Sequence, residues 1–260
     1  MILNIPHAST FIPTWIYDQV FLPKWEEGPL FRPLERKKRT NLDYELLMMT
    51  DWYTDELFDH GLCPSVKAKV SRLVCDTERF EDDALETMSR IGMGLCYTKG
   101  FDLNPIKSFS PEHRKYILKN YYRQHHRRLE ALVDQELEEK GRALILDCHS
   151  FSGIPLPYEN IKTFPRPDIC IGADEYHTPE WLKELAMEHF KNLGYSVSCN
   201  DPFFGSIVPL KHYGCDKRTL SVMVEVNRNL YLKEGSNLKN RNFKALKMQM
   251  RSLEEKLIRS

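Results

Sequence analysis

The chain has 260 residues, with 37 Lys plus Arg, 37 Asp plus Glu and a hydrophobic fraction of 42%. That fraction suffices for a full core and excludes wholesale disorder, while the zero formal charge gives no support for a nucleic-acid or anionic-membrane partner. We therefore expect one α/β domain spanning residues 1–260.

Cysteine usage and the lack of a leader-like segment bear on the cellular compartment. The seven cysteines are an odd set without a C-x-x-C pair, and several lie in or beside apolar runs. This pattern is typical of reduced thiols rather than of a disulfide framework. We expect neither a signal peptide nor a membrane helix, because the N-terminus begins directly with a strand-like run and no apolar stretch is long enough to span a bilayer. We expect a soluble cytoplasmic protein.

The first third of the chain predicts a strand, an irregular segment and a helix. The apolar run Ile2–Ile5 reads as a strand and leads directly to His7. Residues 10–39 are spaced by prolines and are expected to be irregular. Asn41 is a suitable N-cap for an amphipathic helix over about Leu42–His60, which a glycine follows.

A strand, a long loop and a long helix are expected next. Val66–Val70 alternates like a strand. Phe80–Phe109 shows no clear period and contains several glycines, so we expect a lid or binding loop. Ser110 is followed by proline and an acidic residue, a strong signal for a helix that extends to about Lys140.

The remaining sequence alternates between strands and helices. The central strand begins at Ala143, and its apolar residues lead into Asp147, His149 and Ser150. Further elements are expected at Asp168–Gly172 (strand), Thr178–Asn192 (helix), Tyr195–Cys199 (strand), Ser221–Val224 (strand) and Asn237–Ile258 (helix). This alternation predicts an α/β fold of three layers, a mostly parallel or mixed sheet with helices on both faces.

Three apolar runs end in residues suited to a metal hydrolase: His7, His149 and Glu225. Ligands bind at the carboxyl ends of strands in open α/β sheets. Two histidines and a carboxylate, with a fourth position left for water, are typical of catalytic zinc. Alone, His7 could cap a turn and His149 could make a buried hydrogen bond; the two together favour a metal.

The sequence offers more than one candidate for the third metal ligand. No H-x-x-E motif follows His7, because that position is Thr10. Asp51 is the first choice, with Asp76 and Asp147 as alternatives. Asp147 could instead orient a ligand histidine from behind.

Glu225 and several arginines are candidates for catalysis and substrate binding. A carboxylate on a buried strand is costly unless it is paired or functional, so Glu225 either pairs with Arg228 or acts as general base. Arg72, Arg79 and Arg228 follow strand ends, and guanidinium groups bind carboxylates well. These arginines therefore predict an anionic substrate.

Short motifs are spread over nearly the whole chain: Ile5–Ser9 with Ile12–Pro13, Asp51–Trp52 with Asp55 and Leu57, Ser71–Arg79, Tyr121–His126, Leu146–Ser150, Pro202–Gly205, His212–Gly214, and Glu225–Arg228 with Leu230–Tyr231. In this order the set resembles the N-formylglutamate amidohydrolase family. The fold of that family is similar to that of the zinc carboxypeptidases and the aspartoacylase-like deacylases. The resemblance implies such a fold and the hydrolysis of N-formyl-L-glutamate to formate and L-glutamate, a step of histidine catabolism.

The resemblance also implies roles for individual residues. His149, in a D-x-H-S setting, is a metal ligand, and Glu225 is the catalytic carboxylate. Asp76–Arg79 stands in the place of a D-x-N-R motif, in which the arginine, here Arg79, holds substrate or polarises the scissile carbonyl. His126 is taken as a further substrate-binding residue.

The chain departs from the family pattern at a few positions. Glu78 replaces the usual asparagine and puts a negative charge beside the proposed substrate carboxylate, Gln124-His125 stands where Pro-Tyr is common, and Ser206 replaces a glycine. We therefore expect one zinc ion, held by His7, Asp51 and His149, and a small anionic N-acyl amino acid as substrate. Another N-acyl amino acid, a short peptide, or an inactive binding protein on the same scaffold remain alternatives.

Overall fold

The computed structural model describes residues 1–20 and 41–260, which contain one six-stranded sheet with the order β2-β1-β3-β6-β4-β5. The strands are β1 (Ile2–Ile5), β2 (Ser65–Lys67), β3 (Ala143–Phe151), β4 (Ile169–Gly172), β5 (Val197–Cys199) and β6 (Thr219–Asn227). All neighbouring strands are parallel except β4 and β6, which are antiparallel. The expectation of a mixed sheet is confirmed.

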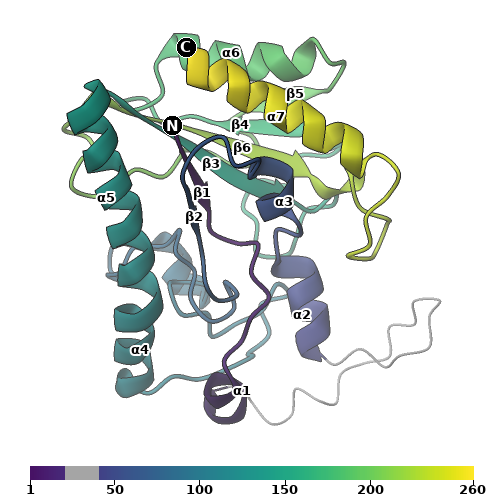
Figure 1. The fold of residues 1–260 in the computed structure, drawn as a ribbon. Coiled ribbons are helices and arrows are strands. Elements are labelled where there is room, and N and C mark those ends of the chain that lie inside the picture. The colour runs from purple at the N-terminus through teal and green to yellow at the C-terminus, as the bar shows by residue number, and fades with distance from the viewer. Residues whose placement is uncertain (21–40) are drawn as a thin grey trace.

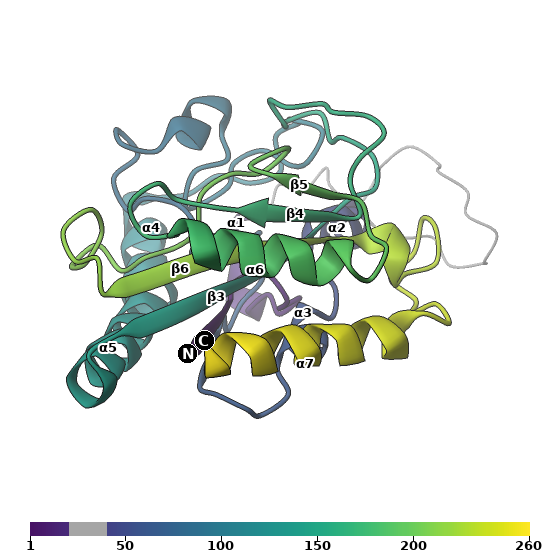
Figure 2. The same cartoon turned by 90° about the horizontal axis from the view of Figure 1, so that it is seen from above.

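Helices cover both faces of this sheet (Figure 1 and Figure 2). The described helices are α1 (Thr14–Val20), α2 (Asn41–Met49), α3 (Thr54–Phe58), α4 (Pro111–Ile117), α5 (Arg123–Lys140), α6 (Glu180–Lys191) and α7 (Phe243–Arg259). Apolar residues of α3, α6 and α7 pack in one core cluster with the sheet, and those of α5 pack in another. The three-layer α/β architecture follows from this arrangement.

The side chains of β3 alternate between the two faces of the sheet, and this alternation decides to which face Asp147 and His149 point. Leu144 and Leu146 belong to the cluster with α3, α6 and α7, whereas Ile145 packs in the cluster with α5. Successive side chains of a strand point to opposite faces, so Asp147 and His149 continue the α5 side. The polar end of β3 therefore faces away from the layer formed by α6 and α7.

The predicted helix Leu42–His60 is wrong as a single helix. Helix α2 ends at Met49 and α3 begins at Thr54, with Asp51 in the connection between them. The backbone N–H of Asp51 donates to the carbonyl of His7 at 3.0 Å, and Tyr53 has a φ of 62°. A contact with the end of β1 thus replaces a helical hydrogen bond and places Asp51 beside His7.

The long helix after Ser110 is confirmed, with one irregularity. The Ser110 hydroxyl accepts from the backbone of His113 at 3.2 Å, and Gly141, in the left-handed conformation, closes the helix. Helices α4 and α5 are joined by a π-helical turn at Leu118–Tyr122. Between Phe80 and Phe109 the backbone is mostly irregular, and its one helical element is a 3₁₀ turn, Thr87–Ile91.

Other boundaries differ from expectation. The strand expected at Val66–Val70 is β2, which ends at Lys67. The terminal helix begins at Phe243 because a bridge between Leu232 and Lys239 holds the preceding residues in a loop. In the stretch expected to be irregular, Thr14–Val20 forms α1, and residues 21–39 lie outside the described part of the chain.

None of the described helices is both long enough and apolar enough to cross a membrane. All seven cysteines are free.

Candidate active site

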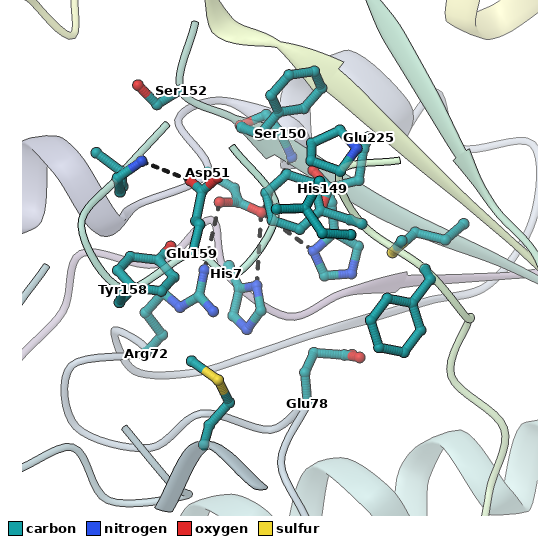
Figure 3. A pocket seen from close by; sticks show the side chains of 18 of the residues that line it. His7, Asp51, Arg72, Glu78, His149, Ser150, Ser152, Tyr158, Glu159 and Glu225 are labelled. Atoms are coloured by element: carbon teal, nitrogen blue, oxygen red, sulfur yellow. Dashed lines mark hydrogen bonds and ion pairs between the residues drawn. The ribbon is translucent and has the colours of Figure 1, made fainter. Parts of the chain in front are cut away.

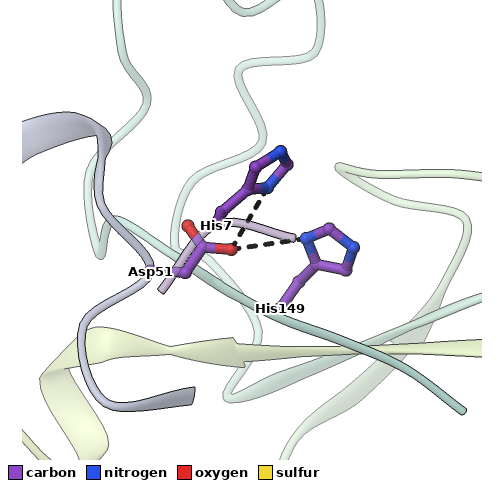
Figure 4. Close-up of side chains that lie close together, drawn as sticks. All are labelled: His7, Asp51 and His149. Carbon is purple, nitrogen blue, oxygen red and sulfur yellow. Dashed lines mark ion pairs between the residues drawn. The ribbon is translucent and has the colours of Figure 1, made fainter. Parts of the chain in front are cut away.

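His7, Asp51 and His149 converge at the carboxyl ends of β1 and β3 (Figure 4). Asp51 Oδ2 lies 3.6 Å from His7 Nδ1 and 3.3 Å from His149 Nδ1. Potential ligand atoms of the three side chains all lie within 4.8 Å of one another, and all three residues are buried. The first-choice ligand set of the sequence analysis is therefore brought together in space.

The outer nitrogens of both histidines are held by carboxylates. His7 Nε2 lies 2.8 Å from Asp76 Oδ1, and His149 Nε2 lies 3.0 Å from Asp147 Oδ1. When each Nε2–H donates to its carboxylate, the neutral ring presents the Nδ1 lone pair toward Asp51. His7 Nδ1 is buried and has no hydrogen-bond partner. This donor set fits a zinc ion, which binds two imidazoles and a carboxylate and keeps one position open.

The electrostatics of the cluster favour a positive charge at its centre. Burial would lower the pKa of His149, but the carboxylates of Asp147 and Asp51 hold that pKa well above its usual range. Burial would raise the pKa of Asp51, but its contacts with His149 and His7 hold that pKa well below its usual range. A proton or a cation at this point is therefore stabilised from several directions.

Glu225 lies beside His149 in the pairing of β3 with β6. Its Oε2 atom is buried and has no hydrogen-bond partner. Burial raises the pKa of Glu225 to about 7, with His149 acting against and Asp51 adding to the shift. A carboxyl with a pKa near neutral and a free oxygen is suited to accept and return a proton.

A cavity of about 350 Å³ opens over these residues (Figure 3). Seven of the eight predicted site residues line it: His7, Asp51, Arg72, Arg79, His149, Glu225 and Arg228. His126 is not among the lining residues; its Nε2 lies 2.9 Å from the carbonyl of Thr77, and its ring packs on Tyr122.

The three arginines of the cavity differ in how far their N–H groups are used. Arg228 donates from all three nitrogens, to Asp51 Oδ1 at 2.9 Å, to the hydroxyl and carbonyl of Ser150, and to the carbonyl of Met48. Arg72 donates to Asp76 at 2.9 Å and to the hydroxyl of Tyr97 at 3.1 Å. Arg79 donates to the carbonyls of Met93 and Glu78 and lies 3.7 Å from the Asp76 carboxylate. Arg72 and Arg79 thus remain the better placed pair for a ligand carboxylate.

Sequence reasoning missed residues that support this site. Asn4, buried in β1, donates from Nδ2 to Asp147 Oδ1 at 2.8 Å and to Glu78 Oε1 at 2.7 Å. Tyr97 donates to Asp76 Oδ2. An asparagine inside the apolar run Ile2–Ile5 was a usable signal, because a buried amide needs partners. The role of Tyr97 had no such signal.

Comparisons with known proteins agree on one family. The sequence profile described as N-formylglutamate amidohydrolase matches residues 1–232. The chain is 28% identical over 196 residues to an N-formylglutamate deformylase of Pseudomonas putida, with 71% of each chain covered. It is similar in structure to an N-formylglutamate amidohydrolase of Ralstonia eutropha, with a TM-score of 0.75, 21% identity, and 98% of this chain and 91% of the other covered. A gene product of Agrobacterium tumefaciens is similar with a TM-score of 0.65, 16% identity, and 99% and 90% of the two chains covered.

Proposed function

The chain belongs to the N-formylglutamate amidohydrolase family, a family of hydrolases acting on an amide, and from this membership we propose that it is a metal-dependent enzyme that cleaves the N-acyl amide of an N-acyl amino acid. N-formyl-L-glutamate, the compound in the names of its relatives, is the first substrate to test. The observation that carries the proposal is the convergence of two carboxylate-backed histidines on Asp51, with the free oxygen of Glu225 nearby.

We propose that His7, His149 and Asp51 would hold one zinc ion. When bound, zinc supplies a Lewis acid and lowers the pKa of a water molecule. The protein's contribution is the orientation of the ligands: Asp76 and Asp147 fix the two rings, and Arg228 holds Asp51 by its other oxygen. Such supporting contacts restrict the ligand atoms to one geometry.

Glu225 would move the proton. Its unpartnered Oε2 would take a proton from the attacking water and return it to the nitrogen of the leaving amine. With N-formyl-L-glutamate the products are formate and L-glutamate. Because the carboxyl is enclosed, the transfer takes place with little competing solvent.

Arg72 and Arg79 would bind a carboxylate of the substrate. Both line the cavity and share the carboxylate of Asp76, while Arg72 also lies 3.9 Å from Asp51, which Arg228 holds as well. The charge of these arginines is therefore only partly compensated. Arg228 would act on the substrate through its charge and through Asp51, since four of its hydrogen bonds already go to Asp51, Ser150 and Met48. The substrate-binding role assigned to His126 stays a prediction.

The segment 80–109 would form a lid. Glu86, Thr87 and Met88 from this segment line the cavity, and its backbone is mostly irregular. Closing over the substrate would exclude water and strengthen the electrostatic contacts inside. Hydrogen exchange with and without a substrate analogue tests this role; equal protection of the segment in both states contradicts it.

Metal content by elemental analysis, together with formate release from N-formyl-L-glutamate, tests the proposed function. One equivalent of zinc and steady formate release are expected. A metal-loaded protein that releases formate only from other N-acyl amino acids or short peptides would support the first alternative. Absence of metal and of hydrolysis would support an inactive binding protein. We also propose a cytoplasmic location, which the free cysteines support.

A further inference from the structure

Three apolar side chains line one side of the cavity and have no role in the hydrolysis proposed above. They are Met223 in β6 and Phe203 and Phe204 in the connection after β5, and we call them the apolar wall. Met223 is buried, whereas Phe204 is 75% exposed, so the apolar wall reaches from the interior of the cavity to the solvent. An exposed aromatic group that continues a cavity wall is suited to hold an apolar part of a ligand.

Strand pairing places the apolar wall beside Glu225. Met223 precedes Glu225 by two residues in β6, so both side chains point to the same face of the sheet. On the neighbouring strand β4, Cys170 pairs with Glu225 and Gly172 pairs with Met223. The Cys170 thiol donates to the carbonyl of Phe203 at 3.3 Å, which holds the backbone of Phe203 over β4. The apolar wall therefore covers the strand next to the proposed general base.

Two further contacts connect the apolar wall to the strands of the site. A Cβ at Gly172 would lie 2.3 Å from Met223 Cε, so the absence of a side chain at Gly172 lets Met223 extend from β6 over β4. The ring of Phe203 packs on that of Phe151, with centroids 5.6 Å apart. Phe151 follows His149 by two residues in β3 and shares its face of the sheet. A group that leaves the reacting centre on this side thus meets Met223 and Phe203.

The arginines lie at the opposite end of the row of strands. Arg72 and Arg79 belong to the connection after β2 and share the carboxylate that contacts His7. In the sheet order β2-β1-β3-β6-β4, the reacting residues at the ends of β1, β3 and β6 lie between these arginines and the apolar wall. Figure 3 shows Arg72 on the side of His7 and Glu225 on the side of His149. A substrate whose carboxylate binds to the two arginines therefore directs the far substituent of its scissile carbonyl toward the apolar wall. In an N-acyl amino acid this substituent is the acyl chain.

We propose that the apolar wall binds the acyl chain of the substrate and makes the enzyme selective for N-acyl amino acids with an apolar acyl chain longer than formyl. The proposal rests on the proposed function and names the acyl group of the same substrate. A formyl group ends in hydrogen and leaves Met223 and Phe203 without a contact, whereas each buried methylene favours binding by about fourfold. Water still cleaves the C–N bond: its oxygen joins the carbonyl carbon and its proton passes to the nitrogen. The products are then a short fatty acid and the free amino acid.

The test keeps the amino acid fixed and lengthens the acyl chain. Release of L-glutamate from N-formyl-, N-acetyl- and N-butyryl-L-glutamate is measured with wild type, Met223→Gln, Phe204→Ser and a control, Met248→Gln. Met248 lies on α7, is exposed and is not among the residues that line the cavity. The ratio of butyryl to acetyl turnover isolates chain length, because both compounds are alkyl amides, whereas a formyl amide is intrinsically more reactive.

Binding is measured separately from turnover. Calorimetry with the acetyl and butyryl compounds uses the same variants combined with Glu225→Gln, which is expected to bind substrate without cleaving it. Thermal unfolding and metal content are recorded for every protein. Because Phe204 is exposed, Phe204→Ser keeps the test open if Met223→Gln does not fold.

Wild type and Met248→Gln are expected to favour the butyryl over the acetyl compound in kcat/KM by about tenfold, because two more methylenes are buried. Met223→Gln should bring this ratio close to one, and Phe204→Ser should lower it by about two- to fourfold. A wild-type ratio near one, or a ratio that neither variant changes, would overturn the proposal.

The outcomes separate this proposal from the proposed function. Release of L-glutamate from the formyl compound alone would leave the hydrolase in place and overturn the selectivity for longer acyl chains. If no compound releases L-glutamate, the proposed function fails and binding decides. Tighter binding of the butyryl compound that Met223→Gln or Phe204→Ser weakens would then support the apolar wall as an acyl-binding site. Equal binding of the two compounds, or none, would overturn it.

Discussion

Two buried histidine–carboxylate clusters of opposite character can be compared within the described residues. One is the group of His7 and His149 with their carboxylates at the strand ends. The other is the pair of His60 and Glu254, which lies where the turn after α3 meets α7. In both clusters a ring nitrogen approaches a carboxylate oxygen closely, at 2.7 Å between His60 and Glu254. Proximity of a buried histidine to a carboxylate therefore does not by itself mark a functional site.

The difference lies in where the second ring nitrogen points. His60 Nε2 faces the carbonyl of Lys247 at 3.0 Å, so both sides of its ring meet protein acceptors. His7 and His149 instead turn their Nδ1 atoms toward one oxygen of Asp51, and His7 Nδ1 has no hydrogen-bond partner. Convergent, incompletely satisfied ligand atoms at a cavity wall are what indicate chemistry.

Removing one histidine from each cluster should have the largest and most divergent effects. His149→Ala should lower zinc affinity by more than about 100-fold, beyond the loss expected for a supporting residue, and leave a folded protein. His60→Ala should retain zinc and lose about 1–3 kcal/mol of stability, because it leaves buried polar partners unpaired. Elemental analysis and thermal unfolding of both variants check the contrast. A full zinc complement in His149→Ala would remove the metal assignment.

Glu225 and Glu254 allow a second comparison of the two clusters, since each has a buried Oε2 without a hydrogen-bond partner. Glu225→Gln keeps the shape but cannot take a proton, so turnover should fall by roughly two to four orders of magnitude with metal retained. Glu254→Gln should leave turnover per folded molecule unchanged. Melting temperature, metal content and turnover are measured on one preparation of each variant. Near-normal turnover of Glu225→Gln would exclude Glu225 from the mechanism.

The strand-end residues of the site were predictable from the sequence. The residues that hold them in position were predictable only in part. His7, His149 and Glu225 follow apolar runs, and the rule that strand ends carry ligands identifies them without a structure. The position of Asp51 was not predictable from local signals, because no glycine or proline marks the break between α2 and α3. A tertiary hydrogen bond to His7 sets that break, and helix propensity contains no information about it.

The order of strands in the sheet shows the same limit. Alternating strands and helices indicate an α/β sheet, but the reversal of β4 against β6 depends on which edges meet after a long connection. The carboxylates that hold the two histidines were also predictable only in part from the sequence. Asp147 was named both as an alternative ligand and as a residue that could orient a ligand histidine, whereas the engagement of Asp76 with His7 depends on how the loop after β2 folds back.

Weakening the support behind one ligand should have a smaller effect than removing the ligand. Asp147→Asn keeps the size of the side chain but loses the charge that holds the Nε2–H of His149. Zinc affinity should fall by about 10–100-fold, the usual cost for such a contact. Titration with a competing chelator measures it, and Asp134→Asn, at the exposed pair with Lys211, is the control. Equal affinity in Asp147→Asn and wild type would contradict the proposed orientation of His149.

The smallest expected effect concerns stability at the His60–Glu254 pair. Burial raises the pKa of Glu254 from 4.5 to about 8, and the neighbouring Asp59 adds to the shift. The folded protein therefore binds this proton more tightly than the unfolded chain. The stability that the group contributes is fully present below pH 4.5 and is lost as the pH rises toward 8.

Glu254→Gln, which is neutral at every pH, removes that loss. Its melting temperature relative to wild type should rise from pH 5 to pH 8.5 by roughly 2–6 °C, which corresponds to about 1–2 kcal/mol for a chain of this size. Glu255→Gln is the matched control, because Glu255 is the next residue of α7 but is partly exposed and pairs with Arg251. The difference in melting temperature between Glu255→Gln and wild type should vary little over the same pH range. If the difference in melting temperature between Glu254→Gln and wild type does not change with pH, Glu254 is ionised in the folded protein. His60 and Glu254 would then form a buried ion pair. The two clusters would differ only in the partners of the second ring nitrogen of each histidine.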